Sequence, residues 1–246
     1  MKSNIKFFNK SKILPVDRFL KNVLYNSKFG YYSSRLPLGE KGDFITSPKI
    51  SYLFSEIIAI WIISTWELFG KPKYFNIIEL GPGDGILTNV LLRSFKKFPE
   101  FNSVKKIFLY EGSEYLIKVQ KKNISDKSVK WINNFNSIKK GPVVFFGNEF
   151  FDALPIKQFF KIHNKWFERY VKLEKNSKGF INIKSDIKKI EKKVGFKISN
   201  NQKIIEYSPL ALNYLKNISK KINNQKGALL IIDYGYLEDS MKDTLM

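Results

Sequence analysis

The chain of 246 residues is 43% hydrophobic, so it is long enough to bury a substantial core, as one domain or as a domain with an insertion. It contains no cysteine and one histidine, His163 in a predicted turn, which argues against disulfides, thiolate sites, Ser-His-Asp triads and multi-histidine metal sites. The formal net charge of +21 comes almost wholly from lysine. Proteins that recognise bases and phosphates specifically tend to use arginine. We therefore favour a compositional bias towards lysine over a dedicated nucleic-acid-binding surface.

The first residues of the chain show no targeting segment. They lack the uninterrupted apolar run and the small-residue cleavage site of a secretory signal, and they are rich in lysine where a transit peptide is rich in arginine. The longest apolar run, residues 57–63, is far too short to span a bilayer. We therefore expect a soluble, cytoplasmic protein without a membrane span.

Two helices joined by a polar loop are predicted in the N-terminal region. Apolar residues recur at helical spacing over Val16–Asn26 and again in a second helix that ends near Leu68. The second helix is expected to start at Ser47 as N-cap, with Pro48 as its first residue. The loop before it, residues 35–47, is rich in hydrogen-bonding groups.

The segment 76–92 has the pattern of a strand, a glycine turn and a helix. Gly81, Gly83 and Gly85 let the backbone turn sharply and approach a ligand closely. A dinucleotide fingerprint needs a small residue directly after the last of these glycines, where the chain has isoleucine. The spacing instead suits S-adenosyl-L-methionine, because the carboxylate of Glu79 can order the ammonium end of that cofactor. A tight turn that binds no ligand is the alternative.

Further apolar runs predict a mostly parallel, doubly wound α/β sheet around this turn. The expected strands are Lys106–Tyr110, Val129–Ile132, Val143–Phe146 and Gly227–Ile232, and the expected helices are Ile86–Phe98, 113–121 and 209–222. Glu111 follows the first of these strands, where an acidic residue reaches the ribose hydroxyls of a bound nucleoside. An exposed glutamate at a helix entrance is the alternative interpretation.

A polar and aromatic segment follows the strand Val143–Phe146. It contains Asn148, Glu149 and Asp152, and ligands of open α/β sheets bind at the carboxyl ends of the strands. Two carboxylates three residues apart, beside aromatic side chains, form a rim that suits a cationic acceptor. A carboxylate that only caps the next turn is the alternative for Asp152.

The pattern changes after this segment. Three short alternating runs separated by hairpin signals predict a small antiparallel insertion before the sheet resumes. We therefore expect an N-terminal helical cap and loop, a cofactor-binding α/β core, the insertion, and a return to the core, with the boundaries 1–70, 71–155, 156–190 and 191–246.

Six motifs in this order resemble the MidA-like family of class I methyltransferases: Gly42–Pro48, Glu79–Gly85, Glu111–Ser113 with Gln120, Asn148–Pro155, Trp166–Arg169 and Asp233–Gly235. The resemblance implies an S-adenosyl-L-methionine-dependent protein arginine methyltransferase. The mitochondrial members of the family act in the assembly of respiratory complex I, so the implied partner is a protein substrate such as a complex I core subunit, and the mitochondrial matrix is the alternative compartment. Family members continue past the motif that corresponds to Asp243–Leu245, so the chain is expected to be a C-terminally incomplete copy without the closing strands.

The resemblance also implies roles for particular residues. Glu149 and Asp152 are expected to accept the N–H bonds of the acceptor guanidinium and so leave the reacting nitrogen more nucleophilic. The residues expected to hold the cofactor or to line its site are Glu79, Gly81, Gly83, Gly85, Glu111, Asn148, Asp43, Thr46 and Ser47, and the last three are placed in a wall near the methyl group.

Two alternatives to this function stay open. A non-catalytic assembly factor that binds the cofactor is one of them. A nucleic-acid methyltransferase is the other, although such enzymes commonly carry an Asn/Asp-Pro-Pro-Tyr tetrapeptide where this chain has Asn-Glu-Phe-Phe, so no specific nucleic-acid partner is expected. The sequence does not indicate an oligomeric state.

Overall fold

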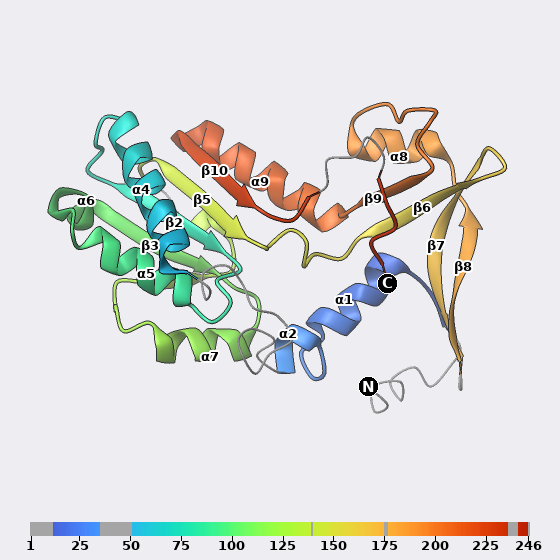
Figure 1. Cartoon of the computed structure of the whole chain (residues 1–246), viewed down its shortest axis with the longest axis horizontal. Coiled ribbons are helices and arrows are strands. Elements are labelled where there is room, and N and C mark those ends of the chain that lie inside the picture. The colour runs from blue at the N-terminus through green and yellow to red at the C-terminus, as the bar shows by residue number, and fades with distance from the viewer. Residues whose placement is uncertain (1–11, 35–50, 139, 175–176, 236–240, 246) are drawn as a thin grey trace. The chain divides into compact units, whose positions relative to one another are not determined.

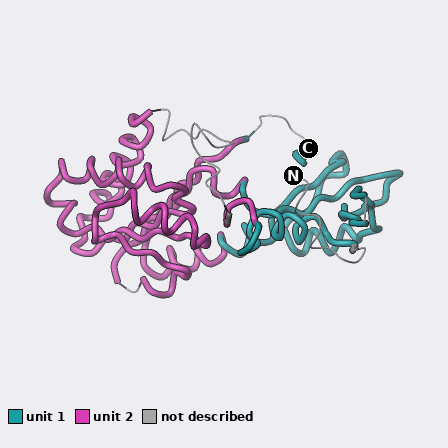
Figure 2. Tube along the Cα trace, turned by 90° about the horizontal axis from the view of Figure 1, so that it is seen from below, with its two compact units in different colours: residues 1–29, 153–214, 235–246 teal, residues 30–152, 215–234 magenta. Residues whose placement is uncertain are grey.

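The computed structural model describes residues 12–34, 51–138, 140–174, 177–235 and 241–245. These residues form two compact units (Figures 1 and 2). Unit 1 combines residues 1–29, 153–214 and 235–246, and unit 2 combines residues 30–152 and 215–234. Each unit is therefore built from segments that are separated in the sequence.

Unit 2 contains the expected parallel sheet. Its strands lie in the order β10-β5-β2-β3-β4, and every neighbouring pair is parallel. Their bounds are Phe75–Leu80 for β2, Lys105–Tyr110 for β3, Lys130–Ile132 for β4, Val143–Asn148 for β5 and Gly227–Ile232 for β10. Parallel pairing brings all five carboxyl ends to one edge of the sheet, where the sequence placed its candidate residues.

The helices of unit 2 are α2 (Tyr31–Ser34), α4 (Tyr52–Leu68), α5 (Ile86–Phe95), α6 (Pro99–Val104), α7 (Glu114–Asn123) and most of α9 (Pro209–Gln225), with the 3-10 turn η2 (Phe135–Ser137). The predicted N-cap of α7 is confirmed, since the Ser113 hydroxyl accepts the N–H of Leu116 at 3.2 Å. The N-cap of α4 is Ser51 and not Ser47, which lies outside the described residues together with Asp43 and Thr46. The predicted helix 86–98 ends earlier, at Phe95. Pro99 begins the separate helix α6, at a position where its missing N–H is not needed.

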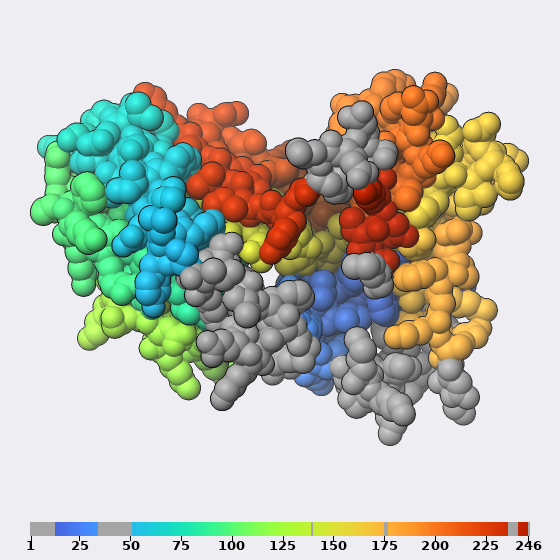
Figure 3. Space-filling model, in the orientation of Figure 1, coloured from blue at the N-terminus to red at the C-terminus, as the bar shows by residue number. Residues whose placement is uncertain are grey.

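Every residue of β2 is buried, which requires cover on both faces of the sheet. One face packs against α4 and α5, and an aromatic cluster closes the amino end of this layer. The ring centroid of Phe101 lies 5.3 Å from that of Trp66, 5.9 Å from Phe75 and 4.9 Å from Phe95. The opposite side of α4 carries exposed apolar residues, and this blue-to-cyan segment lies at the surface in Figure 3.

Unit 1 contains the expected antiparallel insertion, within a larger sheet. The three alternating runs, 157–162, 166–173 and 180–183, lie in the antiparallel strands β6 (Lys157–Ile162), β7 (Lys165–Leu173) and β8 (Lys178–Lys184). Two strands from outside the predicted range join them, since β1 (Lys12–Pro15) pairs with β7 and β9 (Ile204–Tyr207) pairs with β6. Among the described residues, unit 1 also contains the helices α1 (Val16–Tyr25) and α8 (Ile187–Val194) and the first residues of α9.

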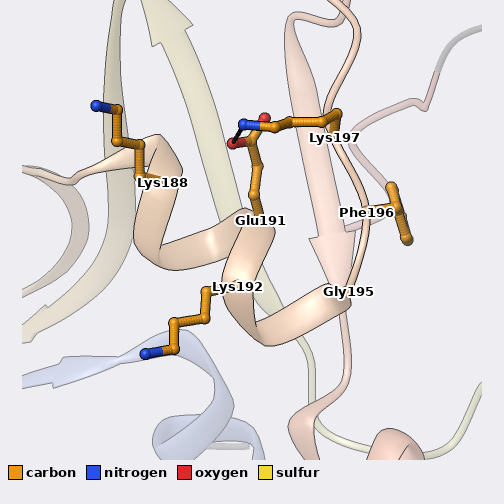
Figure 4. Close-up of a pocket in the computed structure, with 6 residues that line it drawn as sticks. All are labelled: Lys188, Glu191, Lys192, Gly195, Phe196 and Lys197. Atoms are coloured by element: carbon orange, nitrogen blue, oxygen red, sulfur yellow. Dashed lines mark hydrogen bonds and ion pairs between the residues drawn. The ribbon is translucent and has the colours of Figure 1, made fainter.

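A surface hollow of about 440 Å³ lies beside α8 (Figure 4). It is lined by Lys188, Glu191, Lys192, Gly195, Phe196 and Lys197. The lining residues belong to unit 1, which contains none of the predicted site residues that the structure describes. Within the described residues, no helix combines the length and apolarity needed to cross a membrane.

Candidate active site

The candidate site lies where β2, β3 and β5 end. The turn after β2, residues 81–85, is called the glycine turn below, and residues 149–152 after β5 are called the acceptor loop. Since β2 pairs with both β3 and β5, the glycine turn stands between Glu111 and the acceptor loop. Most of the predicted site residues are therefore brought together from distant parts of unit 2.

The three glycines of the glycine turn all have a left-handed backbone. Their φ angles are +62° at Gly81, +58° at Gly83 and +85° at Gly85, which is the N-cap residue of α5. A Cβ atom on Gly81 would lie 2.7 Å from Phe150 Cδ2, and one on Gly85 would lie 2.9 Å from Ile124 Cδ1. Two of the glycines therefore make room for side chains of the protein itself, in addition to any approach of a ligand.

Glu79 lies inside the fold. It is only 3% exposed, and its carboxyl group accepts a hydrogen bond from the hydroxyl of Thr88. Burial raises the pKa of Glu79 to about 8, and the nearby Asp84 contributes to this rise, whereas the bond from Thr88 opposes it. Burial thus favours the protonated form of this side chain, whereas we expected a carboxylate from the sequence. Its contact with the ammonium end of the cofactor stays a prediction.

Glu111 belongs to a network that joins the ends of three strands. Its carboxylate accepts the N–H of Ser113 at 2.8 Å and the amide of Gln120 at 3.2 Å. The same Gln120 amide donates to the carbonyl of Gly83 at 2.8 Å, and its oxygen accepts the indole N–H of Trp131 at 2.8 Å. Burial raises the pKa of Glu111, and these hydrogen bonds oppose the shift. The network therefore fixes the carboxylate beside the glycine turn.

The acceptor loop begins at a residue with an unusual backbone. Glu149 has φ +52°, and its N–H donates to the carbonyl of Ile232 at 2.8 Å. The amide of Asn148 donates to the Glu149 carboxylate at 3.4 Å. Burial raises the pKa of Glu149, with a further contribution from the charge of Asp233. Asp152 is exposed and lies in a turn before the strand β6, so both its role toward the acceptor and the alternative of a turn-capping residue stay predictions.

Two residues of this site were not among the predicted site residues, although Asp233 belongs to one of the six motifs. Asp233 follows β10, and its carboxylate accepts the N–H groups of Phe151 and Asp152 in the acceptor loop. Its position after a predicted parallel strand was a signal that could have identified it. Tyr32 is held by a hydrogen bond of 2.8 Å from the Ser113 hydroxyl to its carbonyl.

The charges of the acceptor loop contribute to the pKa of the Tyr32 side chain. The pKa of Tyr32 is raised to about 12, first by burial and then by the charges of Asp152 and Glu149. In the sequence this tyrosine is one of two adjacent aromatic residues at the end of a helix, a pattern that is typical of core residues. Only the fold shows that it neighbours the acceptor loop.

The chemistry of the site suits an adenosyl cofactor. Glu111 is partly exposed, and each of its carboxylate oxygens has further lone-pair capacity for the hydroxyls of a ribose. The left-handed glycine turn lies beside it, and the polar acceptor loop lies on the other side of that turn. Asp43, Thr46 and Ser47, which were predicted to form a wall near the methyl group, lie outside the described residues.

Comparisons with known proteins indicate the family of the chain. The sequence profile of a family described as "Putative S-adenosyl-L-methionine-dependent methyltransferase" matches residues 57–246. The "Protein arginine methyltransferase NDUFAF7, mitochondrial" of Xenopus laevis is 30% identical over 262 residues, which cover 91% of this chain and 57% of that protein. The human protein of the same name is 30% identical over 247 residues, which cover 91% of this chain and 56% of that protein. The chain thus spans somewhat more than half the length of these relatives.

Two crystal structures of proteins from Burkholderia thailandensis share the fold. Their TM-scores are 0.71 and 0.72 at 22% and 21% sequence identity, and they cover 91% and 92% of this chain but only 59% and 58% of their own. The first of these proteins is bound to S-adenosyl-homocysteine. Since the family profile covers most of the chain, this chain belongs to the family of S-adenosyl-L-methionine-dependent methyltransferases, the MidA-like family that its motifs indicated.

Proposed function

We propose that this protein transfers a methyl group from S-adenosyl-L-methionine to an arginine of a partner protein. The observation that carries the proposal is the contact between the acceptor loop and the glycine turn. The ring of Phe150 fills the space beside Gly81, so the residues on either side of that ring are held next to the cofactor-binding edge. The names of the curated relatives support the choice of arginine as acceptor.

The bound cofactor would supply a methyl group that is activated for displacement. Glu111 would hold the cofactor through its ribose, with Gln120 fixing the carboxylate in place. Glu149, as a carboxylate, would accept N–H bonds from the guanidinium and draw positive charge away from the reacting nitrogen. Asp152 is exposed at the same loop and would hold a second N–H of the acceptor.

The acceptor loop also offers aromatic surface to a cation. The rings of Phe150 and Phe151 pack edge to face, with centroids 5.2 Å apart, next to the two carboxylates. A planar guanidinium can use both the acidic groups and the aromatic faces, whereas a nucleobase amine carries no charge for the carboxylates to balance. This combination favours a protein arginine over a nucleic-acid acceptor.

The proposed partner is a core subunit of respiratory complex I, which is what the resemblance to the MidA-like family implies. The curated relatives are named mitochondrial, and this supports the mitochondrial alternative and not the cytoplasmic interpretation. Binding to bulk nucleic acid is proposed to be weak, salt-sensitive and independent of sequence, because it rests on lysine charge alone.

Isotopically labelled S-adenosyl-L-methionine would test the proposal directly. Purified complex I core subunits are incubated with the protein and the label, and methylated peptides are identified by mass spectrometry. We expect label on arginine with wild-type protein and a strong reduction with Glu149→Gln. Binding of the cofactor without any transfer would instead support the alternative of a non-catalytic assembly factor, and a labelled nucleotide would contradict the proposed acceptor.

A further inference from the structure

Asp233 stands directly after β10 and reaches the acceptor loop with its side chain. One carboxylate oxygen, Oδ2, accepts the N–H of Phe151 at 3.2 Å and the N–H of Asp152 at 3.1 Å. The other oxygen, Oδ1, accepts the N–H of Tyr234 at 2.9 Å. A single carboxylate thus binds backbone groups from two segments that are about 80 residues apart in the sequence.

These bonds fix a loop that local preference alone would not maintain. The left-handed backbone of Glu149 costs on the order of 1 to 2 kcal/mol for a residue with a Cβ atom. The bond from Glu149 N–H to Ile232 continues the pairing of β5 with β10 up to this residue, and Asp233 holds the two amides that follow Phe150. The conformation of Glu149 is therefore determined from both sides by β10 and the residue after it.

We propose that Asp233 is a positioning residue for methyl transfer, which holds the acceptor loop so that Glu149 and Asp152 face the acceptor guanidinium together. This inference rests on the proposed function. It differs from a general role in folding, because the bonds of Asp233 lie beyond the end of the strand ladder and bind only loop amides. The prediction is therefore a loss of catalytic rate with an intact fold and an intact cofactor site.

Three variants separate these roles. Asp233→Ala removes all three acceptor bonds, whereas Asp233→Asn keeps one oxygen that can still accept from the loop. The matched control is Asp126→Ala, which removes another aspartate that accepts a backbone N–H in unit 2, that of Ser128 at 2.9 Å, in the loop before β4. It lies before the amino end of a strand and not at the carboxyl ends where the site is.

For each variant, amide hydrogen exchange of Phe151 and Asp152 is measured by NMR, together with the affinity for S-adenosyl-homocysteine and the steady-state constants of methyl transfer. With Asp233→Ala we expect both amides to exchange at least about 10-fold faster, a kcat about 10- to 100-fold lower, and an affinity for S-adenosyl-homocysteine within about 2-fold of wild type. Asp233→Asn should recover part of the kcat, and Asp126→Ala should match wild type in all three measurements.

Several outcomes would overturn the inference. Unchanged exchange of the two amides in Asp233→Ala would show that the carboxylate does not hold the loop. Faster exchange with a wild-type kcat would show that the bonds of Asp233 to the loop do not affect methyl transfer. An equal loss of kcat and of cofactor affinity would indicate a structural role only. If wild-type protein transfers no methyl group, the proposed function fails, and the amide exchange still decides whether Asp233 holds the acceptor loop.

Discussion

The glycine turn and the acceptor loop end neighbouring strands of one sheet, yet they are built in opposite ways. The glycine turn is packed by other side chains of the protein. Phe150 and Ile124 occupy the space beside two of its glycines, and Glu79 is buried against Thr88. The acceptor loop is held from outside by the carboxylate of Asp233, and its own charged groups stay accessible.

This difference separates a side of the site that is packed into the fold from a side whose backbone is held by Asp233 while its charged side chains stay accessible. A turn that is packed by the protein itself keeps its shape before the cofactor arrives, so little ordering remains to be done on binding. A loop that carries an exposed aspartate and a glutamate with a raised pKa can instead respond to the acceptor. Substitutions in either segment test this contrast.

The largest expected effect is at Glu149. In Glu149→Gln the side chain keeps its size but loses the charge that balances the guanidinium, so we expect turnover to fall by roughly two to three orders of magnitude with nearly unchanged cofactor affinity. Turnover is measured with labelled cofactor and affinity by calorimetry. Asp152→Asn should have a smaller effect, since that residue is exposed. Equal turnover of wild type and Glu149→Gln would remove Glu149 from the catalytic assignment.

The second prediction concerns the pH dependence of stability through Glu79. Its pKa rises from 4.5 to about 8 on folding, so between these values the folded chain keeps a proton that the unfolded chain has released. Its contribution to stability is therefore fully present below pH 4.5 and is lost as the pH rises through 8. Glu79→Gln stays neutral throughout, so it should gain on the order of 3 kcal/mol relative to wild type between about pH 5 and about pH 8.

Denaturant unfolding at the two pH values measures this difference. The control is Glu67→Gln on α4, since the side chain of Glu67 is 52% exposed and forms an ion pair with Lys71, just after the helix, at 3.6 Å. Its relative stability should change little with pH. A parallel response of the two variants would contradict the buried, protonated state of Glu79.

The third prediction tests the packing of the glycine turn. Gly81→Ala forces a left-handed alanine and places its Cβ 2.7 Å from the ring of Phe150, so we expect a loss of about 2 to 3 kcal/mol in the free energy of unfolding. Gly112→Ala is the matched control, because no atom lies within 4 Å of the added Cβ. Phe150→Leu should reduce the clash in the double variant, and purely additive losses would show that the ring is not the obstacle.

The smallest expected effect is at Glu111. Glu111→Ala should weaken cofactor binding by about 1 to 3 kcal/mol, the usual size for hydrogen bonds to a charged acceptor. The fold should survive, because Gln120 retains its bonds to Gly83 and Trp131. Calorimetry with S-adenosyl-homocysteine measures the change. A loss below a few tenths of a kcal/mol would mean that the carboxylate serves only the internal network.

Much of this architecture was predictable from sequence because its signals are local. The strands of unit 2 follow from short apolar runs, and the carboxyl ends of parallel strands had to meet at one edge, which placed Glu111 and Glu149 beside the glycine turn. The capping role of Ser113 was equally local.

The remaining features depend on contacts between distant segments. The bond between Ser113 and Tyr32 joins residues 81 apart, and the ring of Phe150 beside Gly81 brings together two turns that no spacing rule connects. The raised pKa of Glu79 is a consequence of its burial, which the motif alone does not reveal. The helix α4 begins at Tyr52 with Ser51 as its N-cap, whereas the prediction used Ser47, and residue type alone suits either serine to capping.

The pairing of β1 with β7 has a consequence for the order of events during synthesis. Lys12 pairs with Leu173 and Pro15 with Tyr170, so the first described strand leaves the ribosome about 160 residues ahead of its partner. By contrast, β2, β3, β4 and β5 are made one after another between residues 75 and 148. During translation the nascent chain can therefore begin to form its parallel sheet before the partner strand of β1 has been synthesised. A chaperone that covers exposed strand edges would act mainly in this interval.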